Sequence, residues 1–311
     1  MNLVYAGDVP VLPVALLVAL IVGAAAVLWS DGRHTVAPTT AARRAVRHAT
    51  LTAVIAVVPL VLGIAYPYVA FTTGYPFRLD THVDVAVPIG SLWLFLAVYA
   101  CGELTWPRPH DTHRRARLTA RTTADITDAR ARRRVWITTA VLAATCIALM
   151  LAADGPDSIA RVEGGAVERE TIFPGWLWCA PILLASLVAV ALAETVLRLI
   201  AVRPAVVDVD EAWDMWLRRR AARRILRAVQ LVTGLTLAGL ILVAAVALRM
   251  LGQGTVGTAA LPVLPGYVTG GTIAFWAAMV AALATVLATC RRAHDPMPDP
   301  TPARVTAEAR A

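Results

Sequence analysis

The chain has 311 residues, 58% hydrophobic and only 16% charged, whereas about a quarter of the residues in a soluble domain are charged. Its formal net charge is +8, and all 29 of its basic residues are arginine. This composition excludes an ordinary soluble globular protein, and the polar segments between the apolar runs are too short to hold a folded soluble domain.

Seven apolar runs are long enough to cross a bilayer, which takes about 20 residues at roughly 1.5 Å each. We therefore expect an all-α polytopic membrane protein, with a single seven-helix transmembrane domain over residues 1–290 and a disordered cytosolic tail over 291–311. No arginine precedes the first run, which is also too long for the apolar part of a signal peptide, so we interpret it as a span. The predicted spans are residues 11–29, 50–71, 86–106, 135–153, 176–200, 228–251 and 271–290.

The charges predict the orientation. Counted by the loops that the spans define, 25 arginines and 13 acids fall on one side, and 4 arginines and 8 acids on the other. The positive-inside rule places the arginine-rich side in the cytosol, so we expect the N-terminus outside, the C-terminus inside, and a location in the cell (inner) membrane. The basic isoelectric point is then a consequence of topology, and we expect the lipid bilayer as a partner and no nucleic acid.

Loops and spans along the chain carry few chemical signals. His110 and His113 in the second cytosolic loop have a spacing that can bind metal on a helix, but the loop offers no further Cys or His, so we expect no metal site. Gly164-Gly165 predicts a turn in the outer loop of residues 154–171. The last span carries an alanine stripe that predicts close helix packing: Ala277, Ala281, Ala284 and Ala288.

The third cytosolic loop, residues 203–227, predicts an amphipathic helix that continues into the sixth span. Trp213 and Trp216 share one face of this helix with other apolar residues. We expect this face to lie along the inner membrane interface, with docking of a partner subunit as the alternative. The candidate docking or interface residues are Trp213, Trp216, Arg219 and Arg223.

Ionisable residues inside spans are the first place to look for function in a membrane protein. Glu103 and Glu194 lie near the inner ends of the third and fifth spans, and Arg198 follows Glu194 by one helical turn. One interpretation is anchoring together with a Glu194–Arg198 ion pair. The alternative interpretation is that Glu103, Glu194 and Arg198 converge on a polar site at the inner leaflet.

Missing residues exclude several classes of protein. A retinal Schiff base needs a lysine, and the chain has none. All six histidines lie outside the span centres, so a haem held by two histidines within the bundle is not available. The four cysteines occur singly in apolar runs, which is typical of core residues. We expect no cofactor, no catalytic residue can be assigned from a motif, and any use of ATP would require a partner subunit.

Two segments carry a resemblance to a known group of proteins. Gly102-Glu-Leu-Thr-Trp-Pro-Arg-Pro109 and Asp208-Val-Asp-Glu-Ala-Trp213, ahead of an arginine-rich run, resemble uncharacterised multi-span membrane proteins of actinobacteria. The resemblance covers the third to the sixth span. It implies the topology and transfers no activity and no catalytic residue.

Three functional hypotheses remain from the sequence. The leading one is a non-enzymatic, permease-like or accessory subunit of a membrane transport complex, with the cytosolic Trp/Arg helix as its docking surface. The second is an inner-leaflet membrane enzyme or lipid-modifying protein that uses Glu103, Glu194 and Arg198. The third is a structural or sensory membrane protein without a substrate.

Overall fold

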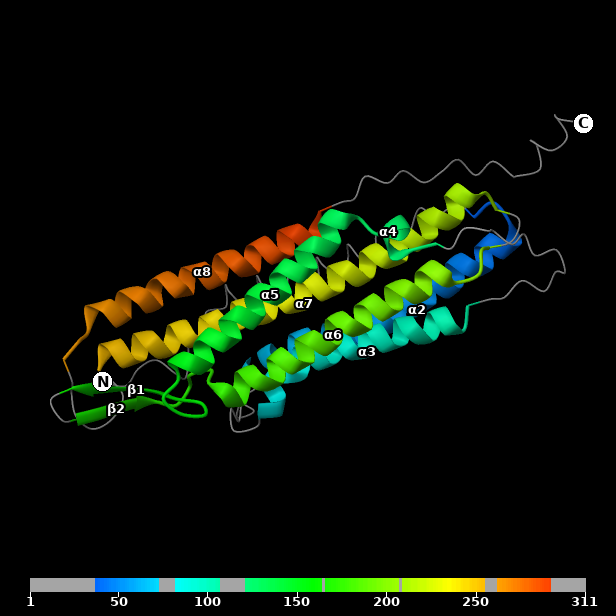
Figure 1. Ribbon diagram of the computed structural model, residues 1–311. Coiled ribbons are helices and arrows are strands. Elements are labelled where there is room, and N and C mark those ends of the chain that lie inside the picture. The colour runs from blue at the N-terminus through cyan, green and yellow to red at the C-terminus, as the bar shows by residue number, and fades with distance from the viewer. Residues whose placement is uncertain are drawn as a thin grey trace, which may run out of the picture.

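The computed structural model describes residues 37–72, 82–106, 121–163, 166–206, 209–254 and 262–291. These ranges are nearly all helical, with one pair of short strands between two of the helices (Figure 1). The elements are α2 (Thr40–Thr72), α3 (His82–Leu104), α4 (Thr123–Ile126), α5 (Ala129–Ala152), β1 (Ile159–Glu163), β2 (Ala166–Glu170), α6 (Trp176–Val202), α7 (Glu211–Gln253) and α8 (Pro265–Cys290).

Six helices are long and apolar enough to cross a membrane: α2, α3, α5, α6, α7 and α8. They coincide with the second to the seventh predicted spans, so the described part of the chain is compatible with an all-α multi-pass membrane protein. The first predicted span, residues 11–29, and the tail beyond residue 291 lie outside the described residues.

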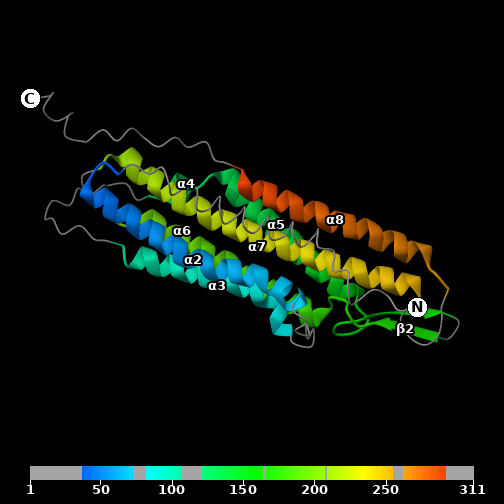
Figure 2. The same ribbon diagram turned by 180° about the vertical axis from the view of Figure 1, so that it is seen from behind.

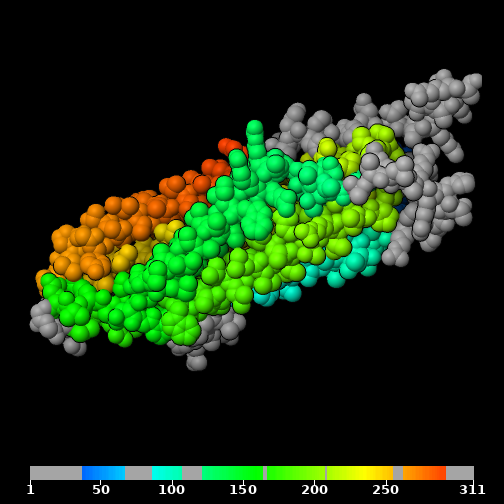
Figure 3. Space-filling model, viewed as in Figure 1, coloured from blue at the N-terminus to red at the C-terminus, as the bar shows by residue number. Residues whose placement is uncertain are grey.

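The helix α7 is the centre of the bundle. It packs against α8, α5, α6 and α3, while α2 packs mainly on α3. Seen from behind, α2 lies on the face of the bundle opposite α5 (Figure 2). In the space-filling view the later turns of α7 show only between α8 and α5, whereas its first turns are visible at the opposite end (Figure 3). This position explains why α7 carries many more buried residues than α5 or α8, whose outer faces remain apolar and exposed.

The packing face of α8 differs from the predicted alanine stripe. The buried residues of α8 are Gly271, Ala278, Thr285, Val286 and Thr289, whereas Ala277 and Ala284 are exposed. The contact requires very small groups, because a Cβ on Gly234 of α7 would lie 2.4 Å from the Thr285 Oγ1. Glycine, rather than alanine alone, therefore sets the distance between α7 and α8.

The loop after α5 contains a β-hairpin, which the all-α prediction did not include. The strands β1 and β2 are antiparallel and flank Gly164-Gly165, with Val162 opposite Val167. Across the hairpin, Arg161 Nε lies 2.6 Å from Glu168 Oε2, and both side chains are almost completely buried. The hairpin lies at the end of the bundle where α7 ends (Figure 1). Strand pairing and a buried ion pair thus structure this loop, for which the sequence predicts only a turn.

Glu170, at the end of β2, predicts a pH dependence of this hairpin. Burial raises the pKa of the Glu170 carboxyl, although the Ile172 N–H donates to Glu170 Oε1 at 3.2 Å. Since the pKa is higher in the folded state, hairpin stability falls as the pH rises above about 4.3, the ordinary Glu value, and levels off above the folded pKa. Glu170→Gln keeps an acceptor for Ile172 and should stabilise the hairpin at neutral pH while removing this pH dependence.

Hydrogen exchange of the peptide over residues 159–172, corrected for the intrinsic exchange rate, measures this effect at pH 4.5 and 7. The control is Glu163→Gln, because the Glu163 side chain is 37% exposed. If Glu170→Gln left the pH dependence of hairpin stability unchanged, this dependence would not come from Glu170.

Candidate functional site

The arginine-bearing helix ends gather at one end of the bundle. The first turns of α2, α5 and α7 and the last turns of α3, α6 and α8 lie toward this end, opposite the hairpin (Figure 1). We call it the arginine-rich end. A separate apolar cluster holds it together: Ala42, Ala45, Trp106, Trp213, Trp216 and Leu217.

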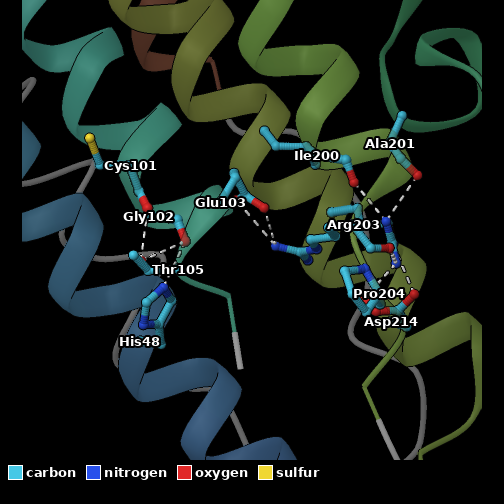
Figure 4. A network of polar contacts seen from close by, with 11 residues as sticks. His48, Cys101, Gly102, Glu103, Thr105, Ile200, Ala201, Arg203, Pro204 and Asp214 are labelled. Carbon is cyan, nitrogen blue, oxygen red and sulfur yellow. Dashed lines mark hydrogen bonds and ion pairs between the residues drawn. The ribbon is translucent and has the colours of Figure 1, made fainter. Parts of the chain in front are cut away.

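Arg218 ties α7 to the end of α6. Its side chain is fully buried, and its Nε donates to Asp214 Oδ2 at 2.9 Å. The terminal nitrogens donate to four carbonyls in and just after the last turn of α6 (Figure 4). These acceptors are Ile200 at 2.6 Å, Ala201 at 3.0 Å, Arg203 at 2.8 Å and Pro204 at 3.3 Å. The last carbonyls of a helix have no partner within it, and this guanidinium donates to two of them and to two carbonyls just after the helix.

Asp214 extends this contact to the segment before α4. Arg121 Nη1 donates to Asp214 Oδ2 at 3.0 Å, and Arg121 Nη2 lies 3.6 Å from Glu211 Oε1. Asp214 is 2% exposed, so its carboxylate is shared by two arginines in a buried position. Asp214 and Arg218 lie one helical turn apart, a spacing that allows an ion pair on one helix face. The prediction of a surface helix did not include this pair.

Glu103 joins the end of α3 to the end of α6. Arg203 Nη1 lies 3.3 Å from each Glu103 carboxylate oxygen, and its guanidinium stacks 3.8 Å above the Trp106 ring. His48 of α2 donates from Nε2 to the Gly102 carbonyl at 2.8 Å (Figure 4). Its ring also meets the Trp106 ring edge-on. Glu103 therefore takes part in a contact that fixes α2, α3 and α6 relative to one another.

Glu194 belongs to a different ion pair. Arg132 of α5 donates to both Glu194 oxygens at 2.8 Å, and Trp136 Nε1 donates to Oε1 at 3.3 Å. The expected Glu194–Arg198 pair is replaced by this contact between helices, and Arg198 is exposed. The planar Arg132 fork faces the carboxylate from the neighbouring helix and forms two parallel hydrogen bonds. Glu103 and Glu194 thus have separate arginine partners, and neither pair includes Arg198.

The tryptophans expected at the membrane interface lie inside the protein. Trp213 is 2% exposed and Trp216 is 9% exposed, and both pack in the apolar cluster with Trp106 and the first turns of α2. This corrects the prediction of a tryptophan face directed at lipid or at a partner. On the same helix Arg219 is exposed and Arg223 is half-buried, so arginine rather than tryptophan forms the available surface.

A narrow crevice opens between α2, α3 and α7 at the arginine-rich end. Its enclosed volume is about 10 Å³, which is room for roughly one water molecule. Its polar lining includes His48, Tyr99, Glu103, Arg220 and Arg224. Sequence reasoning did not single out Tyr99 or Arg224, because each lies alone among apolar or arginine-rich neighbours.

No group of three or more His, Cys, Asp or Glu side chains that could hold a metal ion occurs in the part of the chain that the structure describes. The arrangement supplies ion pairs, a cation–π contact and buried donors at the arginine-rich end. Comparison of the chain with protein families, with curated proteins and with solved structures found no match.

Proposed function

We propose that this multi-pass membrane protein is a non-enzymatic, permease-like or accessory subunit of a membrane transport complex. The arginine-rich end faces the cytosol in this proposal, because the loops at that end carry most of the arginines. The proposal rests on one observation: the acids near the inner ends of the spans form ion pairs between segments. Glu103, Glu194 and Asp214 each pair with arginine from another segment and hold helices together.

An enzyme that used these acids would need at least one carboxylate open to a substrate. Both Glu194 oxygens accept from Arg132, and both Glu103 oxygens face Arg203. Such pairing favours a structural role for the acids over a catalytic one. The hypothesis of a membrane enzyme that uses Glu103, Glu194 and Arg198 is therefore the weaker one.

The proposed docking surface is the part of α7 that carries the exposed Arg219 and the half-buried Arg223, and its partner presents an acidic cytosolic surface. Arg219 is exposed, and its Nε donates to the Asp125 carbonyl at 3.3 Å, which holds α4 beside it. The buried network around Arg218 keeps this part of α7 in a fixed position. A preformed basic surface favours encounter with an acidic partner and fixes its orientation.

Charge reversal tests the docking surface. The Arg219→Glu/Arg223→Glu double variant, expressed at native level and purified in mild detergent, should retain roughly a tenth or less of a stoichiometric partner subunit, measured by native mass spectrometry. The matched control is Arg133→Glu/Arg134→Glu, which changes the charge equally at two exposed arginines of α5. Equal loss in both variants, or a wild-type protein that carries no partner, would overturn the proposal.

Glu194→Gln separates this proposal from the enzyme hypothesis. Arg132 is 38% exposed in the pair, so screening by solvent limits the loss of stability to about 1 kcal/mol. We expect the variant to assemble and to complement a deletion strain nearly as well as wild type. Loss of all activity in a correctly assembled protein would favour the enzyme hypothesis.

A further inference from the structure

The crevice between α2, α3 and α7 has a buried floor and a more open side. The floor is formed by buried residues of α3 and α7, whereas the lining residues of α2 are half-buried. The α2 side is therefore the opening. The lining residues are Val46, His48, Ala49, Thr50, Thr52, Tyr99, Gly102, Glu103, Trp106, Leu217, Arg220, Ala221 and Arg224.

Two donors in the floor lack a hydrogen-bonding partner. Tyr99 is 3% exposed and Arg224 is 5% exposed, and neither Tyr99 Oη nor Arg224 Nε makes a hydrogen bond within the described residues. The hydroxyl lies beside the Arg224 guanidinium. Buried polar groups are normally satisfied, so two such donors on residues that line one crevice indicate an acceptor that comes from outside the chain.

The charges at the crevice favour an anion. Glu103 is the carboxylate among the lining residues, and both of its oxygens face Arg203. Within the part of the chain that the structure describes, Arg224 has no carboxylate partner. A buried guanidinium without a counter-charge is strongly unfavourable, so an anion at this position would stabilise the fold.

We propose that this crevice binds a phosphate group, supplied by the headgroup of an anionic phospholipid or by free phosphate. Guanidinium and hydroxyl donors from two helices match the several oxygens of a phosphate. The enclosed volume accommodates one oxygen between Tyr99 and Arg224, with the rest of the phosphate at the opening beside α2. Tyr99 lies five residues before the end of α3, roughly 7.5 Å along the helix, which is the depth of a headgroup.

Exposed residues of α2 give an additional reason to expect that the phosphate belongs to a lipid. Immediately after Thr50 at the crevice, α2 exposes an apolar stripe that could lie along an acyl chain. The stripe consists of Leu51, Ile55, Val58 and Leu62, which are between 50% and 65% exposed. The proposal does not depend on any partner protein, so its test is independent of the proposed function.

Titration of the full-length protein in maltoside detergent distinguishes the sources. Three probes are compared by the shift in melting temperature: dioctanoyl phosphatidylglycerol, dioctanoylglycerol, which lacks the phosphate, and inorganic phosphate. A shift with phosphatidylglycerol alone supports a lipid headgroup site, and a shift with inorganic phosphate supports a free phosphate site. Equal shifts with the two lipids, or none with any probe, would overturn the proposal and leave the crevice as a site for water.

Two variants locate the binding. Tyr99→Phe and Arg224→Gln should each weaken the apparent affinity for the phosphate probe by about tenfold, since each removes a hydrogen bond to a charged acceptor. The control Arg133→Gln removes an exposed charge and should change affinity by less than about twofold. Tyr99→Phe deletes an unsatisfied hydroxyl, so the ligand-free protein should melt no lower than wild type while binding is weakened. Unchanged affinity in both variants would overturn the assignment.

Discussion

Replacement of Arg218 by methionine is expected to lower the free energy of unfolding by about 3–5 kcal/mol. The side chain is fully buried and satisfies four carbonyls at the end of α6 in addition to Asp214. Methionine fills much of the volume but leaves these acceptors without donors, and each buried unsatisfied group costs about 1–3 kcal/mol. Thermal unfolding in lipid nanodiscs measures the loss.

The adjacent arginine is the control for this substitution. Arg219→Met removes the same charge, but Arg219 is exposed and makes one long hydrogen bond at 3.3 Å, so the change should stay within about 0.5 kcal/mol. Arg218→Lys should recover only part of the stability, because an ammonium group cannot reach the four carbonyls as the planar fork does. Similar melting temperatures for Arg218→Met and Arg219→Met would show that the network contributes little.

Gly271→Val is expected to separate α8 from α7 and to destabilise the protein by about 2 kcal/mol or more. A Cβ at Gly271 would lie 2.7 Å from the Ala245 carbonyl oxygen and 3.0 Å from the Arg249 nitrogen. Both atoms belong to the backbone of α7, so no side-chain rotation relieves the clash. Among the described residues α8 packs almost entirely on α7, so no second helix there holds it in place.

The neighbouring glycine provides a matched control. Gly270→Val makes the same change in helix propensity one residue earlier, where a Cβ would meet nothing within 4 Å. We expect Gly270→Val to unfold near the wild-type temperature and Gly271→Val to unfold well below it. Equal melting temperatures would contradict the close approach of the two helices.

Over the described residues, the apolar runs alone predict which segments form helices long enough to cross a membrane. Apolar runs of about 20 residues can satisfy their backbone in lipid only as helices, so six predicted spans coincide with α2, α3 and α5 to α8. The continuation of the loop helix into the sixth span was also correct, as the single helix α7 of 43 residues. Hydropathy does not mark where a helix ends outside the membrane, and α2 begins at Thr40 rather than near residue 50.

The contacts of the polar and aromatic side chains, in contrast, depend on how the helices pack. Local spacing predicted Arg198 as the partner of Glu194, but Arg132, 62 residues away, forms the pair, because the neighbouring helix presents its guanidinium squarely to the carboxylate. Trp213 is buried for a similar reason, since α2 and Trp106 cover a face that helical periodicity describes only as apolar. Periodicity identifies a face of a helix, whereas the choice among lipid, another helix and an ion-pair partner depends on which segments fold against it.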